Sequence, residues 1–188
     1  MDKLQIVAAA GPLQVIWDLD KLDLDQAKSS LTTAVQYARQ LIERGDAASL
    51  DDAAKIYAAV LAIPSLPAAS PYRAEIQSLY GALLCLRAQN EPDSPSAAHW
   101  LERAHQLLHA ALKVRAPGTM PEAWATTSAN LALVYLTRYV RTRNHADLMA
   151  AHLALDGTSD VFVRTNDAAS AAWVHGLRDY LIELAGRG

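Results

Sequence analysis

The sequence has one cysteine, one phenylalanine and no unbroken apolar run of the roughly 20 residues that a membrane-spanning helix needs. Because Cys85 is the only cysteine, the chain cannot form an internal disulfide framework or a cysteine-based zinc site. A lone thiol is compatible with a reducing compartment.

The chain also has no excess of positive charge, because 17 basic residues face 20 acidic ones and the formal net charge is −3. No overall basic field therefore attracts nucleic acid or an anionic membrane, and we expect neither as a partner.

The first twelve residues lack the features of a targeting signal. Their only basic residue is Lys3, which follows Asp2, and Gly11-Pro12 interrupts the apolar segment. We therefore expect a cytoplasmic protein.

The composition favours helices over strands. Apolar residues make up 52% of the chain but aromatic residues only 6%, and alanine, the best helix former, dominates the apolar set. Proline and glycine lie in clusters that cut the chain into helix-length segments with apolar residues three and four positions apart. This pattern predicts an all-α fold of about seven helices, over 25–44, 50–63, 72–89, 97–115, 121–141, 145–163 and 168–186. We expect one domain over 25–188, preceded by a lead-in element over 1–24.

An internal repeat relates these helices. Ala53, Tyr57, Val60 and Leu61 match Ala104, Leu108, Ala111 and Leu112, each 51 positions further along (53 to 104). The run Tyr80-Gly81-x-x-Leu84-x-x-Arg87 matches Leu131-Ala132-x-x-Tyr135-x-x-Arg138 at the same offset. Two helices that keep one register indicate a duplicated helix pair. The small residues Gly81, Ala132 and, in a shorter third copy, Gly176 are expected to let each helix approach its partner closely.

The repeated residues resemble those of tetratricopeptide repeats. Leu131-Ala132-x-x-Tyr135 supplies the first-helix signature, and Ala104 with Leu108, Ala111 and Leu112 supplies the second. The run Pro121-Glu122-Ala123-Trp124-Ala125 resembles the longer-period repeats of bacterial proteins that carry caspase-like CHAT domains. The resemblance covers about residues 45–185 and includes no catalytic portion, and the period exceeds the usual ~34 residues. It implies a solenoid of antiparallel helix pairs that acts as a protein-binding adaptor, with no cofactor and no enzymatic activity.

The same resemblance implies a groove lined by the first helix of each pair, over 72–89, 121–141 and 168–186. At the position of Asn130, the family often bonds the ligand backbone. The other side chains expected at the groove are Thr126, Ala129, Leu133, Glu75, Ser78 and Cys85. Arg138, Arg141 and Arg143 form the clearest basic patch, which Arg87 joins from one repeat away, and Arg87 and Arg138 are expected at the groove. Arginines in the last turn of a helix complement the helix dipole, and contact with an acidic partner peptide or an anionic ligand is the alternative. The apolar ends of so short an array also suggest a homodimer through its end helices.

One predicted helix carries several ionisable side chains on one side. His99, Glu102, His105 and His109 fall within about a third of its circumference, and Glu-x-x-His is a metal-ligand pattern in helical bundles. Because the sequence has no second Glu-x-x-His, we expect no metal here and interpret the face as solvated surface. The alternative is a helical-bundle protein or enzyme that binds a metal or small molecule through this face or the Arg138 cluster.

Overall fold

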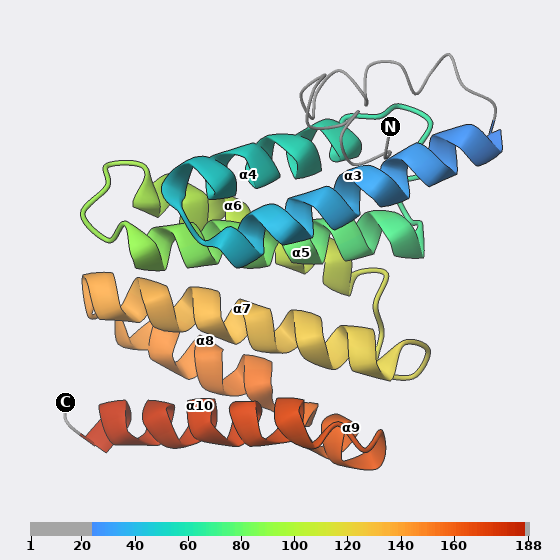
Figure 1. Cartoon of the computed structure of the whole chain (residues 1–188). Coiled ribbons are helices and arrows are strands. Elements are labelled where there is room, and N and C mark those ends of the chain that lie inside the picture. The colour runs from blue at the N-terminus through green and yellow to red at the C-terminus, as the bar shows by residue number, and fades with distance from the viewer. Residues whose placement is uncertain (1–23, 187–188) are drawn as a thin grey trace. The chain divides into compact units, whose positions relative to one another are not determined.

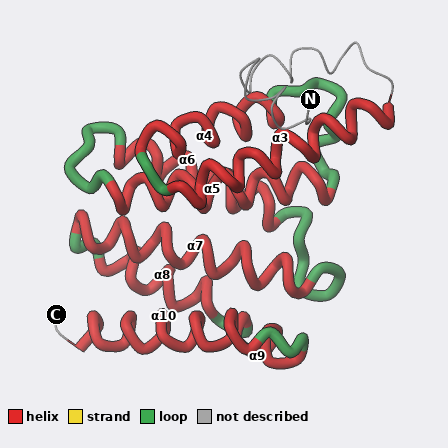
Figure 2. Tube along the Cα trace, viewed as in Figure 1, coloured by secondary structure: helices red, strands yellow, loops and turns green. Residues whose placement is uncertain are grey.

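The structure is a computed structural model, and it describes residues 24–186. Every regular element in this range is a helix, which confirms the predicted all-α class (Figures 1 and 2). The predicted lead-in element over 1–24 lies, apart from Leu24, outside the described residues.

The seven predicted helices are all present, and one of them is divided in two. The helices are α3 (Leu24–Arg44), α4 (Ala47–Leu61), α5 (Pro71–Asn90), α6 (Ala97–Leu112), α7 (Pro121–Thr142), α8 (His145–Leu155), α9 (Thr158–Arg164) and α10 (Ala168–Gly186). The chain divides into two compact units between Pro67 and Ala68, inside the proline-rich linker that follows α4. The two units are described one at a time.

In the first unit, α3 and α4 pack against each other across a two-residue connection. Gly45 has a φ of 74°, in the left-handed region that glycine adopts without strain after a helix. The carboxylate of Asp46 then accepts a hydrogen bond from the backbone N–H of Ser49 at 2.9 Å. This cap starts α4 at Ala47, three residues before the predicted start. Tyr57 of α4 is fully buried.

In the second unit, α5 and α6 pack as a close antiparallel pair around Gly81. A Cβ atom at this glycine would lie 2.7 Å from Cγ of Leu108 and 3.2 Å from the carbonyl oxygen of Ala104. No other residue type allows the two helices to approach this closely without displacing a buried neighbour. The predicted role of Gly81 is therefore confirmed.

Helix α7 runs parallel to α5, and the hydrogen-bonded residues of the two helices lie 48 to 52 positions apart. The Ser78 hydroxyl lies 3.1 Å from Oγ1 of Thr127, 49 positions along the chain, and the Gln89 amide donates to Thr137 at 2.9 Å, 48 positions along. Beyond the end of α5, Arg141 bonds the carbonyl of Pro92, again 49 positions apart. The two helices therefore lie side by side with the same direction and register. Figure 1 shows α5, α7 and α10 in one layer of this unit, with α6 and α8 behind them.

The predicted helix 145–163 is broken at Gly157, which has a φ of 71°. The break leaves the carbonyl of Leu155 without a helical partner, and two side chains satisfy it. The Thr158 hydroxyl donates to this oxygen at 2.7 Å and the Arg178 guanidinium at 3.1 Å. Helix α9 is thereby folded back onto α10, and both contribute to the buried core shared by α7, α8, α9 and α10.

The predicted role of Gly176 is wrong. A Cβ atom on this residue would meet nothing within 4 Å. Helix α10 instead turns a different side toward the core, and that side carries Ala171, Val174, Leu177, Leu181 and Leu184. The third repeat copy therefore does not keep the register that Gly176 suggested.

Candidate functional site

Three of the predicted groove residues share one stripe of α7. Thr126 is exposed, whereas Asn130 and Leu133 are half-buried, and their spacing of four and three residues places them along one side of the helix. Glu75 of α5 is half-buried and lies 51 positions before Thr126, at the matching place in the repeat. These four side chains form the candidate binding face.

Ser78 and Cys85 lie elsewhere, in the interface between α5 and α7. Both are only 3% exposed. Sγ of Cys85 lies 3.6 Å from Oγ1 of Thr137, and burial raises the pKa of its thiol to about 11. The thiol is therefore protonated at neutral pH. Ser78 and Cys85 of α5 join this helix to α7 through their contacts with Thr127 and Thr137.

The interface also contains Arg115, which the sequence did not single out. Its guanidinium donates to Oγ1 of Thr127 at 2.9 Å, and burial lowers its pKa, against the opposing effect of the Glu75 carboxylate. Arg115 is the last residue of the predicted helix 97–115. Helix α6 instead ends at Leu112, before Pro117, and the following turn carries Arg115 inward.

Arg87 and Arg138 lie on the side of α5 and α7 that faces the following helix. The Arg87 guanidinium is 4.1 Å from the centre of the Trp100 ring in the first turn of α6. Nε of Arg138 is 3.3 Å from Oδ1 of Asp147 in the first turn of α8. These two arginines, 51 positions apart, thus occupy matching places in the two copies, although Arg87 makes a cation–π contact and Arg138 an ion pair. Each connects a first helix to the start of its partner.

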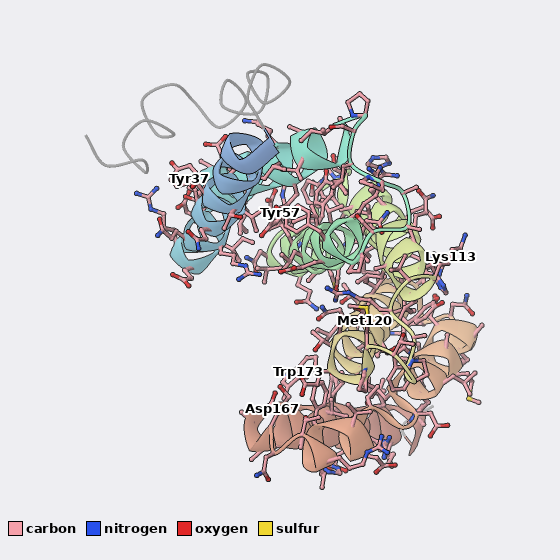
Figure 3. All side chains as sticks on the ribbon, turned by 90° about the vertical axis from the view of Figure 1, so that its right-hand side faces the viewer. Tyr37, Tyr57, Lys113, Met120, Asp167 and Trp173 are labelled. Atoms are coloured by element: carbon pink, nitrogen blue, oxygen red, sulfur yellow. The ribbon has the colours of Figure 1, made fainter. Side chains whose placement is uncertain are left out.

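The three tryptophans in residues 24–186 differ in how far they are buried. Trp100 is half-buried under Arg87, and Trp124 packs against the C-terminal core. Trp173 differs, because 44% of its surface is exposed. Figure 3 shows Trp173 between the ribbons of α7 and α10, and Trp17 lies outside the described residues.

A polar cluster at the back of this layer joins α6, α7 and α8. Nε2 of His105 and Nε2 of His109 lie 3.0 and 3.2 Å from the hydroxyl oxygen of Tyr135. Glu102 is close by, with Oε2 3.8 Å from Nη1 of Arg138. The sequence predicted His105 and His109 to share a face but missed Tyr135, which was interpreted only as a repeat residue. His99 is exposed and lies outside this hydrogen-bonded cluster.

The surroundings of the cluster favour the uncharged forms of the His105 imidazole and the Tyr135 phenol. Burial lowers the pKa of His105, and His109 and Arg138 lower it further, while Glu102 and Asp147 raise it. Burial also raises the pKa of Tyr135. One neutral phenol therefore faces two imidazoles.

Comparison with known proteins gives no relative: no protein-family model matches this sequence, and no curated protein and no solved structure shows significant similarity to it. Within residues 24–186, no helix combines the length and the apolar character needed to cross a membrane.

Proposed function

We propose that this chain is a tetratricopeptide-like repeat module that binds a peptide or helix of a partner protein along the layer of α5, α7 and α10. The observation that carries the proposal is the parallel, in-register packing of α5 and α7, with contacts between residues 48 to 52 positions apart. Successive helices of a simple up-and-down bundle alternate in direction around one core, whereas stacked helix pairs place each first helix beside the next at a fixed offset.

Two further features support a repeated unit. The close approach at Gly81 has its counterpart in Ala132, which is fully buried 51 positions later. Arg87 and Arg138 each contact the first turn of the next helix. A single bundle gives no reason for both a small residue and an arginine to recur at one offset.

The candidate binding face has the chemistry that an extended peptide needs. The Asn130 side chain carries both a donor and an acceptor, which suits the N–H and C=O groups of a peptide backbone. Leu133 offers apolar surface beside it, and Thr126 is exposed. The half-exposed indole of Trp173 adds an aromatic surface from α10.

Site-specific photocrosslinking tests the proposal. A photoreactive amino acid at Thr126 is compared with one at Gln106, an exposed residue of α6. We expect one partner to be captured from native lysate through position 126, not through 106, and to be lost in Asn130→Ala. Equal capture from both positions, or capture unaffected by Asn130→Ala, would contradict a binding face on α7.

A second candidate is self-association through α10. Trp173, Tyr180 and Ile182 of this helix are 44%, 44% and 57% exposed, more than most large apolar residues of the second unit. Light scattering over a range of concentrations tests it. A dimer that Trp173→Ala and Tyr180→Ala convert to a monomer supports this reading, and a monomer at all concentrations excludes it.

A further inference from the structure

One guanidinium of the second unit is buried without an ion pair. Arg115, in the turn between α6 and α7, is only 8% exposed. An arginine keeps its charge inside a protein, yet no carboxylate of residues 24–186 lies within ion-pair distance of this one. The charge of Glu75 acts on Arg115 from a greater distance. A buried charge without a paired anion is costly, so an anion that pairs with Arg115 would be strongly favoured.

Only one of the three guanidinium nitrogens of Arg115 is used by the protein. Nη1 donates to Oγ1 of Thr127 at 2.9 Å and to the carbonyl oxygen of Ala123 at 3.4 Å, so both of its hydrogens are engaged. Nε is shut off from solvent and has no hydrogen-bond partner. Nη2 likewise donates no hydrogen bond within the described part of the chain.

The two unused nitrogens form one edge of the guanidinium. Nε–H and one hydrogen of Nη2 point in the same direction, and this fork matches the two oxygens of a carboxylate. The contacts of Nη1 hold the fork in place, because Thr127 of α7 is itself 3.1 Å from the hydroxyl of Ser78 in α5. Arg115 is therefore fixed by two helices while its binding edge has no protein acceptor.

The surroundings of this edge favour a carboxylate over a phosphate. Little of Arg115 is exposed, so a flat group has to displace less of its surroundings than a tetrahedral one. The nearby charge of Glu75 also repels a dianion more strongly than a monoanion. Because Glu75 belongs to the candidate binding face, the edge of Arg115 lies close to that face.

We propose that Arg115 is a carboxylate-binding residue, and that the carboxylate is an acidic side chain of the partner segment bound along the candidate binding face. The site itself is argued from Arg115 and its neighbours, and only the source of the carboxylate rests on the proposed function. A free small carboxylic acid carries the same group, so the experiment has to separate these two sources.

Titration of the full chain with sodium acetate tests the site, with sodium chloride at equal ionic strength as the reference. Isotope-edited NMR spectroscopy follows the Nε–H signal of Arg115, which is assigned by its loss in Arg115→Lys. We expect acetate to shift this signal to saturation and chloride to leave it unchanged. Backbone amide signals beside Thr127 should report the same binding curve.

Three variants separate this site from general attraction to positive charge. Hydrogen bonds to a charged group are worth enough that Arg115→Lys, which lacks the fork, should weaken acetate binding by at least about tenfold. The same change at Arg103, an exposed arginine of α6, should have no effect. Glu75→Gln removes the repelling charge and should tighten binding. Circular dichroism checks that each variant keeps its helices.

No saturable acetate shift in the wild type, equal binding in Arg115→Lys, or tighter binding of inorganic phosphate than of acetate would overturn the proposal. Photocrosslinking from position 126 then separates the sources. Weaker capture of the partner in Arg115→Lys than in Arg103→Lys supports an acidic side chain of the partner, whereas equal capture overturns that source and assigns the site to a free carboxylic acid. Failure of the binding face itself, seen as equal capture from positions 126 and 106, would leave the acetate result standing.

Discussion

The same substitution at two helical glycines should have opposite effects on stability. In Gly81→Ala the new Cβ would lie 2.7 Å from Cγ of Leu108, a side chain with no exposed surface. Cγ is the branch point of a fully buried side chain and not a flexible end, so Leu108 or the helices themselves must shift. Inserting a methyl group into a packed core typically costs about 1–3 kcal/mol. Alanine also favours the helix over glycine by about 1 kcal/mol, so the net loss for Gly81→Ala is about 0–2 kcal/mol.

Gly176→Ala is the matched control, because a Cβ at that position meets nothing within 4 Å. Only the helix preference remains, so this variant should be more stable than the wild type by about 1 kcal/mol. The difference between the two variants isolates the cost of packing, about 1–3 kcal/mol.

Urea unfolding followed by far-ultraviolet circular dichroism measures the free energies of unfolding of Gly81→Ala and Gly176→Ala. Shortening the opposing side chain in Gly81→Ala/Leu108→Ala should make the two changes less than additive, because Leu108→Ala removes the atom that the new methyl group meets. Gly81→Ala as stable as Gly176→Ala, or strictly additive effects in the double variant, would refute the close approach of α5 and α6.

Three further predictions follow from single residues. The folded-state pKa of His105 lies below its ordinary value of about 6.5, so the unfolded chain binds more protons in acid. Stability should therefore fall as the pH drops below about 6.5, and His105→Gln should flatten this part of a melting-temperature profile against pH. Cys85 is buried and the pKa of its thiol is raised to about 11, so iodoacetamide should label it in urea but not in the native protein. Mass spectrometry measures this labelling, and fast labelling of the native protein would disprove the burial of Cys85. Gly157→Ala places a side chain at a φ of 71° and should destabilise the protein by about 1–2 kcal/mol in urea unfolding, whereas no loss would mean that α8 and α9 merge without strain.

The limits of the helices were predictable because proline, glycine and capping residues act locally. Every predicted limit lies within three residues of the observed one. The break at Gly157 was missed because a lone glycine inside a helical pattern is often tolerated. The break is supported by a tertiary contact, because Arg178, more than 20 positions away, donates a hydrogen bond to the freed carbonyl of Leu155.

The faces of the helices were harder to predict than their limits. A first helix in a stack has neighbours on several sides, so nearly every stripe carries apolar residues and periodicity alone does not say which neighbour covers it. Thr126, Asn130 and Leu133 lie along one side of α7, whereas Ala129 of the same helix is fully buried. Ser78 lies between α5 and α7, and Arg87 and Arg138 contact the following helices. The convergence on Tyr135 was hidden because its partners lie 26 and 30 positions away.

The parallel register of α5 and α7 is the basis of the repeat and of the proposed binding face, and disulfide trapping tests it directly. In a Cys85→Ala background, cysteines are introduced at Ser78 and Thr127, whose hydroxyl oxygens are 3.1 Å apart, and separately at Ser78 and Thr137. Stacked helix pairs predict rapid oxidation of Ser78→Cys/Thr127→Cys and none of Ser78→Cys/Thr137→Cys. Cross-linking of only the second pair, as antiparallel packing of the two helices would favour, would contradict the repeat.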